Sequence, residues 1–434
     1  MEIKKPILQV ALDFVDLNRA IKLAQEAVEG GCDWIEAGTP LIKSEGLNAI
    51  RELRKAFPGK TIVADMKIMD VGRTEVEIAA KAGANIVCVL GCAHMETIKE
   101  CVDAGKNYGA RIMVDMLEVK NIPELVKQVE KLGVAYIGVH IPIDEQMTGK
   151  ISFDTVTKIA KITKLPIAIA GGINSENAAD AVKAGASIII AGGSITKSKD
   201  AKKAAFDIKK AITQKIKIKS ELFKRVTSEN ANEIGAILNK TSVANVSDAL
   251  HRALPLKDIY SVFNGVKIFG PAVTVRTYPG DWAKPVEAID LASKGDVIVI
   301  DAGGVEPAVW GELATSSAIQ KKLGGVVIHG AIRDVTDIRK LKFPAFAKKI
   351  TPQAGEPKGF GEINIPIVIS GVPVSPGDWI VGDDDGVIVI PKEKLAETTN
   401  RAMDVLEKEN RIREEIHRGN TLAKVAQLLK WEKK

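Results

Sequence analysis

The feature that most constrains the fold is a unit repeated through the first half of the chain: a short apolar run, a loop, and an amphipathic stretch that ends near glycine. The apolar runs occupy residues 7–12, 33–37, 61–65, 86–90, 111–115, 136–140, 166–170 and 187–191. Strands that are joined in turn by helices run parallel to one another. Eight such units within residues 1–212 therefore predict a closed (β/α)8 barrel, also called a TIM barrel.

The residues that close these runs carry most of the chemistry. In a (β/α)8 barrel the active site lies at the carboxyl ends of the strands. Charged residues and a histidine close several of the runs, and glycine pairs follow the last two: Asp13, Glu36, Asp65, Asp115, His140, Gly171, Gly172, Gly192 and Gly193. The sequence therefore predicts that these residues line one mouth of the barrel.

Charge is densest after the third run, where Asp65, Lys67 and Asp70 stand close together. Burying an ion costs several kcal/mol unless the ion is paired. The segment therefore indicates mutual pairing, a metal or a charged ligand. An ordinary salt-bridged loop is the alternative interpretation.

Two kinds of binding site are predicted at this mouth. Glu36 and Asp65 offer the carboxylate oxygens that Mg²⁺ prefers, although pairing with Lys67 alone is the other interpretation. The glycine pairs at 171–172 and 192–193 follow the two strands where such barrels commonly bind phosphate through backbone amides. His140 faces both sites and titrates near neutral pH, so we expect a catalytic role rather than that of a core histidine.

Composition argues against several classes of protein. The chain has 434 residues, 46% of them hydrophobic, and no apolar run approaches the roughly 18 residues of a membrane span. No secretory signal is recognisable at the N-terminus, so a cytoplasmic protein is expected. The four cysteines lie mostly in apolar runs, which argues against disulfides and zinc. The net charge of +6 is spread among acids and does not indicate nucleic-acid binding.

The motifs of the first half resemble 3-hexulose-6-phosphate synthase, a branch of the orotidine-5'-monophosphate decarboxylase superfamily. The resemblance covers residues 5–212 and rests on segments at 10–13, 36–42, 64–70 and 191–195, including the pattern Asp65-x-Lys67-x-x-Asp70. Glu36 favours the metal-dependent branch. A sister branch decarboxylates 3-keto-L-gulonate 6-phosphate and carries Arg shortly after the site histidine, an arginine that this chain lacks after His140.

This resemblance implies an aldolase, dependent on Mg²⁺ or Mn²⁺, that joins formaldehyde to D-ribulose 5-phosphate through an enediolate, in either direction. It implies that Glu36 and Asp65 hold the metal. Three further roles follow for charged residues: Lys67 would neutralise the carboxylates and the developing oxyanion, His140 would be the base or proton shuttle, and Asp70 would reach the site of a neighbouring subunit in a barrel dimer. Asp13 and Asp115 would contact the substrate.

A different pattern begins after the barrel. Residues 214–220 alternate lysine with isoleucine and predict an extended linker. Beyond it, helices are expected at 222–239, 246–254 and 312–323, and strands at 266–277, 297–301, 326–329 and within 365–391. We expect a break in the first of these strands at Gly270-Pro271, and a helical tail at 392–434 that clasps a domain or subunit. The absence of a fixed repeat predicts a separate α/β domain.

Three motifs of the second half, at 301–304, 310–314 and 330–334, resemble the RraA-like family, which includes class II pyruvate aldolases. The resemblance implies that a 2-oxo acid is bound by Arg333 and by a loop of amides: Gly311, Glu312, Leu313 and Ala314. Asp334 would hold Mg²⁺ through water. Non-catalytic regulators share this fold, so fold alone does not decide between an enzyme and a protein-binding regulator.

The sequence thus predicts a fusion, with a barrel at 1–214, a linker at 215–221 and an RraA-like domain with its helical tail at 222–434. We expect a homo-oligomer built on barrel dimers that acts on a phosphosugar and formaldehyde, without membrane or nucleic-acid partners. A decarboxylase barrel with a non-catalytic RraA-like domain is the alternative.

Overall fold

The computed structural model describes residues 3, 5–149, 151–222, 224–227 and 231–426. Contacts divide the chain into two compact units. The first unit comprises residues 1–146, 150–224 and 407–434, and the second comprises 147–149 and 225–406. The described end of the tail, from residue 407 onward, is therefore counted with the first unit.

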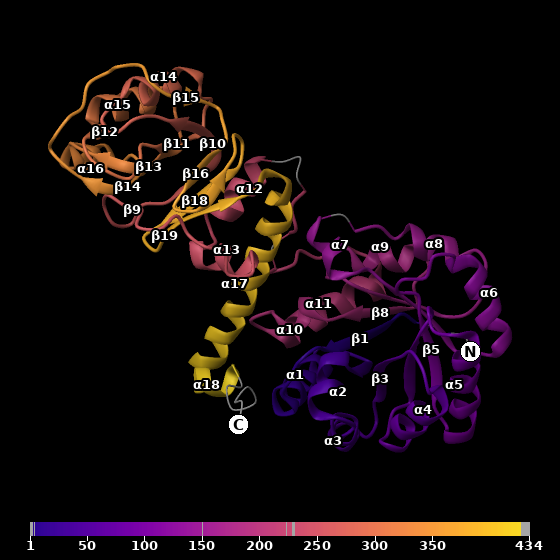
Figure 1. Ribbon diagram of the computed structural model, residues 1–434. Helices are drawn as coiled ribbons and strands as arrows, with labels where there is room; N and C mark the ends of the chain where they lie inside the picture. The colour runs from indigo at the N-terminus through magenta and orange to yellow at the C-terminus, as the bar shows by residue number, and fades with distance from the viewer. Residues whose placement is uncertain (1–2, 4, 150, 223, 228–230, 427–434) are drawn as a thin grey trace. The chain divides into compact units, whose positions relative to one another are not determined.

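The first unit contains a closed barrel of eight parallel strands, which follow one another around it in sequence order (Figure 1). The strands are β1 (Ile7–Leu12), β2 (Trp34–Ala37), β3 (Thr61–Ile68), β4 (Ile86–Leu90), β5 (Arg111–Asp115), β6 (Tyr136–His140), β7 (Ile167–Ala170) and β8 (Ile188–Ala191). Seven lie within one residue of the predicted runs, and β3 continues three residues further. The predicted (β/α)8 barrel is confirmed.

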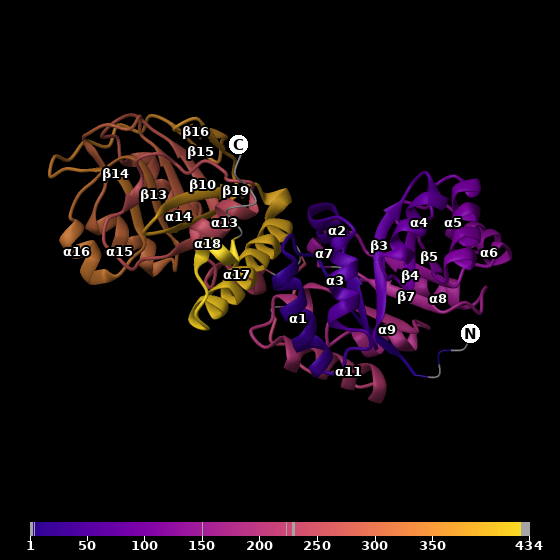
Figure 2. The same ribbon diagram turned by 90° about the horizontal axis from the view of Figure 1, so that it is seen from below.

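Helices surround these strands (Figures 1 and 2). They are α1 (Leu17–Glu29), α2 (Thr39–Glu45), α3 (Asn48–Ala56), α4 (Gly72–Lys81), α5 (Met95–Tyr108), α6 (Ile122–Leu132), α7 (Ile143–Met147), α8 (Asp154–Ala160), α9 (Ala178–Lys183), α10 (Gly193–Thr196) and α11 (Ala201–Gln214). In α1, Asp16 caps the start by accepting a hydrogen bond from the amide of Arg19. Gly30 at its end lets α11 pack closely, because a Cβ there would lie 2.3 Å from the carbonyl oxygen of Lys202.

Alternation along the strands sorts their side chains into two layers. On β1, Leu8, Val10 and Leu12 pack with the helices, whereas Ala11 packs inside the barrel. The interior is filled by buried side chains: Ala11, Val63, Ile86, Cys88, Met113, Tyr136, Ala168, Ile188 and Ile190. Positions two residues further along the inward faces of β1, β3 and β5 are Asp13, Asp65 and Asp115, so these carboxylates stand over the filled core at the carboxyl mouth.

The second unit is built on a mixed sheet in the order β19-β18-β10-β11-β13-β14-β9 (Figure 1). Its strands are β9 (Tyr260–Ser261), β10 (Ile268–Arg276), β11 (Val297–Asp301), β12 (Ala308–Trp310), β13 (Gly325–Ile332), β14 (Ala345–Ile350), β15 (Glu362–Ile363), β18 (Trp379–Asp383) and β19 (Gly386–Ile390), with β16 (Ile367–Ile369) and β17 (Val372–Val374) as a separate pair. The strands β10, β11, β13 and β14 are parallel. The predicted separate α/β domain is confirmed.

Helices of the second unit are α12 (Ala231–Leu238), α13 (Val243–Ala249), α14 (Ala283–Leu291), α15 (Glu312–Gln320) and α16 (Val335–Leu341). One buried cluster lines each face of the sheet. The cluster that includes Ile300 and Ile328 packs with side chains of α14, α15 and α16. The other, which includes Val299 and Val327, packs with side chains of β16 to β19.

Several predicted elements of the second half were wrong in their bounds. The helix predicted at 222–239 is observed as α12 at Ala231–Leu238, and residues 224–227 form neither helix nor strand. The helix predicted at 246–254 ends at Ala249. The strand expected to break at Gly270-Pro271 is continuous as β10, because its first residues pair with β18 and its later residues pair with β11.

The tail is helical, as predicted. It contains a short 3-10 turn (Lys392–Lys394), α17 (Leu395–His417) and α18 (Leu422–Val425), and residues 427–434 lie outside the described part. Residues 395–406 of α17 count with the second unit and residues 407–417 with the first. Among the described residues, no helix is long and apolar enough to cross a membrane.

Candidate active sites

Four predicted residues form a chain of contacts across the barrel mouth. The Nζ atom of Lys67 lies 3.2 Å from Oδ2 of Asp65 and 3.2 Å from Oδ2 of Asp115. The Nδ1 atom of His140 lies 4.0 Å from the same Asp115 oxygen. Burial lowers the pKa of Lys67, but the two carboxylates outweigh it and raise that pKa above its usual value. Lys67 is therefore a fixed cation between β3 and β5, with His140 beside it.

A β-bulge aims Lys67 into this position. The pairing of β3 with β4 shifts register between Ala64 and Ile68, and Lys67 within this stretch has φ of +46°. A residue other than glycine in the left-handed region is strained, and such strain persists only where the surroundings hold it. The ion pairs of Lys67 with Asp65 and Asp115 keep it in this conformation.

Glu36 is a buried carboxylate without a cation. It is 8% exposed, and the side-chain amide of Gln9 donates a hydrogen bond to it. Among the described residues it forms no ion pair. Burial, followed by the charges of Asp65 and Asp13, raises the pKa of Glu36 well above its usual value. Asp65 is oriented by Thr39, whose Oγ1 donates to its Oδ2 at 2.7 Å.

Asp13 lies between the loops that follow β2 and β8. A Cβ placed on Gly38 would lie 2.3 Å from its Oδ1, and one placed on Gly192 would lie 3.7 Å from its Oδ2. Desolvation of the carboxyl by the surrounding mouth, followed by the charge of Asp65, raises the pKa of Asp13. The residue nevertheless keeps an exposed surface. Asp13 thus joins the acidic centre to the second glycine loop.

This acidic centre fits a divalent cation. The charge of Asp65 raises the pKa of Asp13 and of Glu36, in addition to the effect of burial. Oε1 of Gln9 is buried without a partner among the described residues. No group of three or more His, Cys, Asp or Glu side chains arranged to hold a metal exists in the described part of the chain. Mg²⁺ usually takes only one or two carboxylates and completes its shell with water and substrate. Glu36 and Asp65 can supply that share.

The two glycine loops lie at the same mouth, between His140 and Asp13. Gly171 has φ of +98°, and a Cβ there would lie 2.3 Å from the carbonyl oxygen of Ile141, so the turn requires glycine. A Cβ on Gly193 would lie 3.1 Å from Cε and Nζ of Lys197. Gly172 and Gly192 stand beside them at the ends of β7 and β8. The second loop therefore brings backbone amides and a lysine together.

Asp70 is the predicted catalytic residue that the chain does not bring to this cluster. It is exposed, and its Oδ1 accepts a hydrogen bond from the amide of Val71 at 2.7 Å. The side chains of Met69 and Val71 on either side are 53% and 56% exposed. The predicted reach of Asp70 into a neighbouring subunit remains a prediction.

The second unit has its own polar centre at the carboxyl ends of its parallel strands. Oδ2 of Asp334 accepts a hydrogen bond from the amide of Glu312 at 3.1 Å and lies 3.5 Å from Nε of Arg333. Glu312 begins α15, whose first amides have no partners within the helix. Leu313 is 79% exposed, and Ala314 follows it in the same turn. Arg333, Asp334 and the amide loop that begins at Gly311 are thus brought together.

The sequence analysis gave no role to several polar residues of these centres, although Thr39 and Asp301 lie within the motifs at 36–42 and 301–304. In the barrel they are Gln9, Thr39 and Lys197, and in the second unit they are Asp301 and His329, whose Oδ1 and Nδ1 lie 2.9 Å apart. A signal existed for Gln9, a polar residue two positions before Ala11 on the inward face of an apolar run. No signal marked Lys197, because it lies beyond the strand end and reaches back over a helical turn.

The fold and these centres define the class of each half: a (β/α)8 barrel with an active-site-like mouth, followed by a mixed α/β domain. The family model described as orotidine 5'-phosphate decarboxylase/HUMPS family matches residues 6–208, and the model described as Aldolase/RraA matches residues 243–389. The chain belongs to the orotidine 5'-phosphate decarboxylase/HUMPS family through its barrel, which is similar to 3-hexulose-6-phosphate synthases, and it carries an RraA-like domain after the barrel.

Two curated relatives and one solved structure are similar to parts of this chain. The 3-hexulose-6-phosphate synthase of Bacillus subtilis (strain 168) is 41% identical over 48% of this chain and 99% of its own length. That of Methylomonas aminofaciens is 39% identical over 46% of this chain and 97% of its own length. The structure of the RNA-processing inhibitor RraA from Thermus thermophilis is 30% identical over 34% of this chain and 91% of that chain, with a TM-score of 0.32.

Proposed function

We propose that the barrel is an aldehyde-lyase that joins formaldehyde to D-ribulose 5-phosphate, reversibly, to give D-arabino-3-hexulose 6-phosphate. The observation that carries this proposal is the contact chain of Asp65, Lys67, Asp115 and His140 at the mouth that also carries the glycine loops. It puts a fixed cation and a histidine in the same mouth as two loops that suit a phosphate, and His140 lies beside the first of these loops. The similarity to 3-hexulose-6-phosphate synthases supports the same reaction.

In this proposal the phosphate binds the amides of the glycine loops, and Lys197 adds a positive charge. His140, oriented by Asp115, removes a proton from C1 of ribulose 5-phosphate and leaves an enediolate. C1 then attacks the carbonyl carbon of formaldehyde, a C–C bond forms as the C=O π bond opens, and the resulting alkoxide takes from His140 the proton removed from C1. Lys67 donates hydrogen bonds to the developing oxyanion. Mg²⁺ or Mn²⁺ held by Glu36 and Asp65 would supply further positive charge for the oxygens at C2 and C3.

The direct test uses the purified full-length protein with ribulose 5-phosphate and formaldehyde. We expect 3-hexulose 6-phosphate to form, EDTA to stop its formation, and added Mg²⁺ to restore it. The alternative, a decarboxylase barrel, predicts instead that 3-keto-L-gulonate 6-phosphate releases carbon dioxide while formaldehyde is not consumed. Measuring both products in parallel separates the two proposals.

Gly193→Val should raise the KM for ribulose 5-phosphate by about tenfold or more, since a charge-assisted hydrogen bond contributes roughly 1.5–3 kcal/mol. The added side chain would displace Lys197 and block the approach of the phosphate to the amide of Gly193. Initial-rate kinetics measure the effect. Gly59→Val is the matched control, because a Cβ at Gly59 meets no atom within 4 Å. A KM equal to that of the control would place the phosphate elsewhere.

For the RraA-like domain we propose a metal-dependent site for pyruvate or a similar 2-oxo acid. The observation that favours it is that a carboxylate, that of Asp334, already rests on the amide of Glu312 beside Arg333. A 2-oxo acid can be held by the amides at a helix N-terminus together with an arginine. A cation can be held by a carboxylate such as that of Asp334. A regulator that acts only through its outer surface would not require this combination, and it remains the alternative.

Arg333→Ala should weaken the binding of oxalate, an enolate mimic, to the RraA-like domain in the presence of Mg²⁺. The guanidinium is proposed to fix one carboxylate, and a charge-assisted hydrogen bond lost from it lowers affinity by roughly tenfold or more. Calorimetry on the full-length protein measures the loss. Arg339→Ala, at an exposed position on α16, is the control. Wild-type protein without oxalate binding, or equal binding by Arg333→Ala, would contradict the proposal.

A further inference from the structure

The second glycine loop continues into a segment whose carbonyl groups face outward. After β8, the helical turn α10 is closed by hydrogen bonds from the amides of Thr196 and Lys197 to the carbonyl oxygens of Gly192 and Gly193. Ser198 and Lys199 then lead to Asp200, which caps α11. Any movement of residues 198–200 therefore moves the turn that carries Gly193 and Lys197. We call residues 192–200 the phosphate loop.

Arg411 of α17 holds this loop from outside the barrel. Its residue is 4% exposed, and its Nη1 donates hydrogen bonds to the carbonyl oxygens of Ser198 and Lys199, each at 3.2 Å. Its Nη2 lies 3.3 Å from Oε1 of Glu26 on α1, and its Nε donates to Glu415 at 3.0 Å. Every nitrogen of the guanidinium thus has a partner. A buried arginine with this many partners fixes the groups it binds, because each partner would otherwise be left unsatisfied.

Neighbouring ion pairs fix Arg411 itself. Arg19 of α1 lies 3.1 Å from Oε1 of Glu415, the same oxygen that accepts from Arg411. Arg418 donates a second hydrogen bond to the carbonyl oxygen of Lys199 at 3.2 Å. Residues 407–417 of α17 belong with α1 to the first unit, and Arg411 and Glu415 of this stretch contact Glu26 and Arg19 of α1. The phosphate loop is therefore tied to a helix that follows the RraA-like domain in the sequence.

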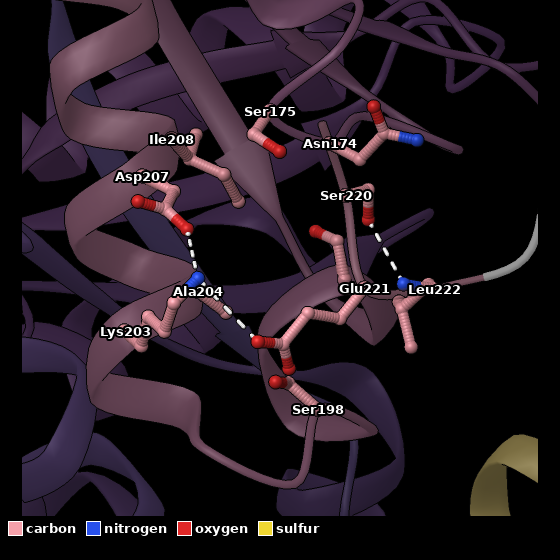
Figure 3. Close-up of a pocket in the computed structure, with 11 residues that line it drawn as sticks. Asn174, Ser175, Ser198, Lys203, Ala204, Asp207, Ile208, Ser220, Glu221 and Leu222 are labelled. Atoms are coloured by element: carbon pink, nitrogen blue, oxygen red, sulfur yellow. Dashed lines mark hydrogen bonds and ion pairs between the residues drawn. The ribbon is translucent and has the colours of Figure 1, made fainter. Parts of the chain in front are cut away.

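The linker supports the same loop at a second place. A pocket on the outer side is lined by Ser194 and Ser198 of the phosphate loop, by α11 and by Glu221 of the linker (Figure 3). Lys203 of α11 pairs with Glu221 at 3.4 Å, and the amide of Ile218 donates to the carbonyl oxygen of Ser175 at 3.0 Å. The linker thus runs behind both glycine loops. Two segments outside the barrel's own strands and helices, α17 and the linker, therefore contact the phosphate loop.

We propose that Arg411 is a positioning residue for phosphate binding by the barrel, acting through the carbonyl groups of Ser198 and Lys199. The proposal rests on the proposed phosphosugar function. Under this proposal the affinity of the barrel for phosphate depends on α17, a helix that follows the RraA-like domain in the sequence. The two curated synthases align over nearly their whole length with the barrel and have no counterpart of this helix.

The test compares full-length wild type with Arg411→Lys and Arg411→Met. Lysine keeps the charge but presents one compact ammonium, which cannot bind two carbonyls and two carboxylates together. For Arg411→Lys we expect the KM for ribulose 5-phosphate to rise about tenfold while kcat stays within about twofold of wild type. The hydrogen bonds lost lie far from the reacting atoms, so substrate binding should weaken without a change in the chemical step. Arg411→Met should show a larger rise. Arg413→Met is the control, since Arg413 is exposed and contacts only Glu409 and Asn410 among the described residues.

Calorimetric titration with inorganic phosphate gives a second readout that needs no turnover. We expect Arg411→Lys to bind phosphate about tenfold more weakly than wild type and Arg413→Met to bind it equally well. Unchanged KM and unchanged phosphate affinity in a folded Arg411→Lys protein would overturn the proposal, and so would a loss confined to kcat. Wild-type protein that binds phosphate but does not condense formaldehyde would instead refute the proposed reaction, and the phosphate titration would still decide the role of Arg411.

Discussion

Asp65→Asn should abolish the aldolase activity of the full-length protein, lowering kcat/KM by about a thousandfold or more, the scale on which lost electrostatic stabilisation acts. Asparagine has the same volume and can still accept the hydrogen bond from Thr39. It cannot form an ion pair with Lys67, and of the two carboxylates proposed to hold the cation it leaves only Glu36. We therefore expect both the activity and its stimulation by Mg²⁺ to disappear while the fold is retained.

Steady-state assays over a range of Mg²⁺ concentrations, together with circular dichroism and thermal melting, measure these effects. Asp33→Asn is the matched control, because Asp33 sits at the opposite end of β2, where it pairs with Lys209 at 2.6 Å and accepts from the amide of Leu8 at 2.7 Å. The control loses a carboxylate charge from the same barrel without touching the mouth. Turnover of Asp65→Asn close to that of the control would show that neither pairing with Lys67 nor metal binding by Asp65 supports the reaction.

The barrel and much of its mouth could be predicted because both follow from short-range rules. A repeated apolar run fixes parallel strands, and alternation along a strand decides which residues face inward. These rules therefore predict, without any knowledge of contacts, that Asp65, Asp115 and His140 lie at the same mouth of the barrel. The bulge at Lys67 did not, because the strand was predicted to end at Asp65 and nothing local indicates a left-handed residue two positions later.

Contacts between distant parts of the sequence account for the rest. Arg411 contacts Glu26 and Ser198, more than two hundred positions away in each case, so no local pattern distinguishes it from other arginines on an amphipathic helix. The helix expected from residue 222 shows the same effect in reverse. Its apolar pattern was real, but the amide of Val226 donates to Oδ1 of Asn400 at 2.8 Å and Arg225 pairs with Asp404 at 3.1 Å, both on α17. Tertiary contacts there override helical propensity.

Mixing two inactive variants should restore activity if Asp70 serves a neighbouring subunit. Lys67→Ala lacks the cation of its own site, and Asp70→Ala lacks the carboxylate proposed for its neighbour's site. Asp70 is exposed, with the exposed apolar side chains of Met69 and Val71 beside it, as expected for a segment that another barrel covers. In a random mixture of symmetric dimers, roughly a quarter of all sites would contain both wild-type residues. We therefore expect activity to rise from background to about a quarter of the wild-type value.

The control mixture distinguishes a shared site from simple stabilisation by a partner. Lys67→Ala mixed with Asp65→Asn cannot regenerate a site, because Lys67 and Asp65 contact each other within one chain and every site of a mixed dimer lacks one of them. Subunit exchange is verified in both mixtures by co-purification of differently tagged copies, and activity is followed as exchange proceeds. Recovery only with Asp70→Ala would establish that each barrel mouth is completed by its neighbour. Equal recovery in both mixtures would contradict a shared site, and so would no recovery in either mixture after exchange. Asp70 would then act, if at all, within its own chain.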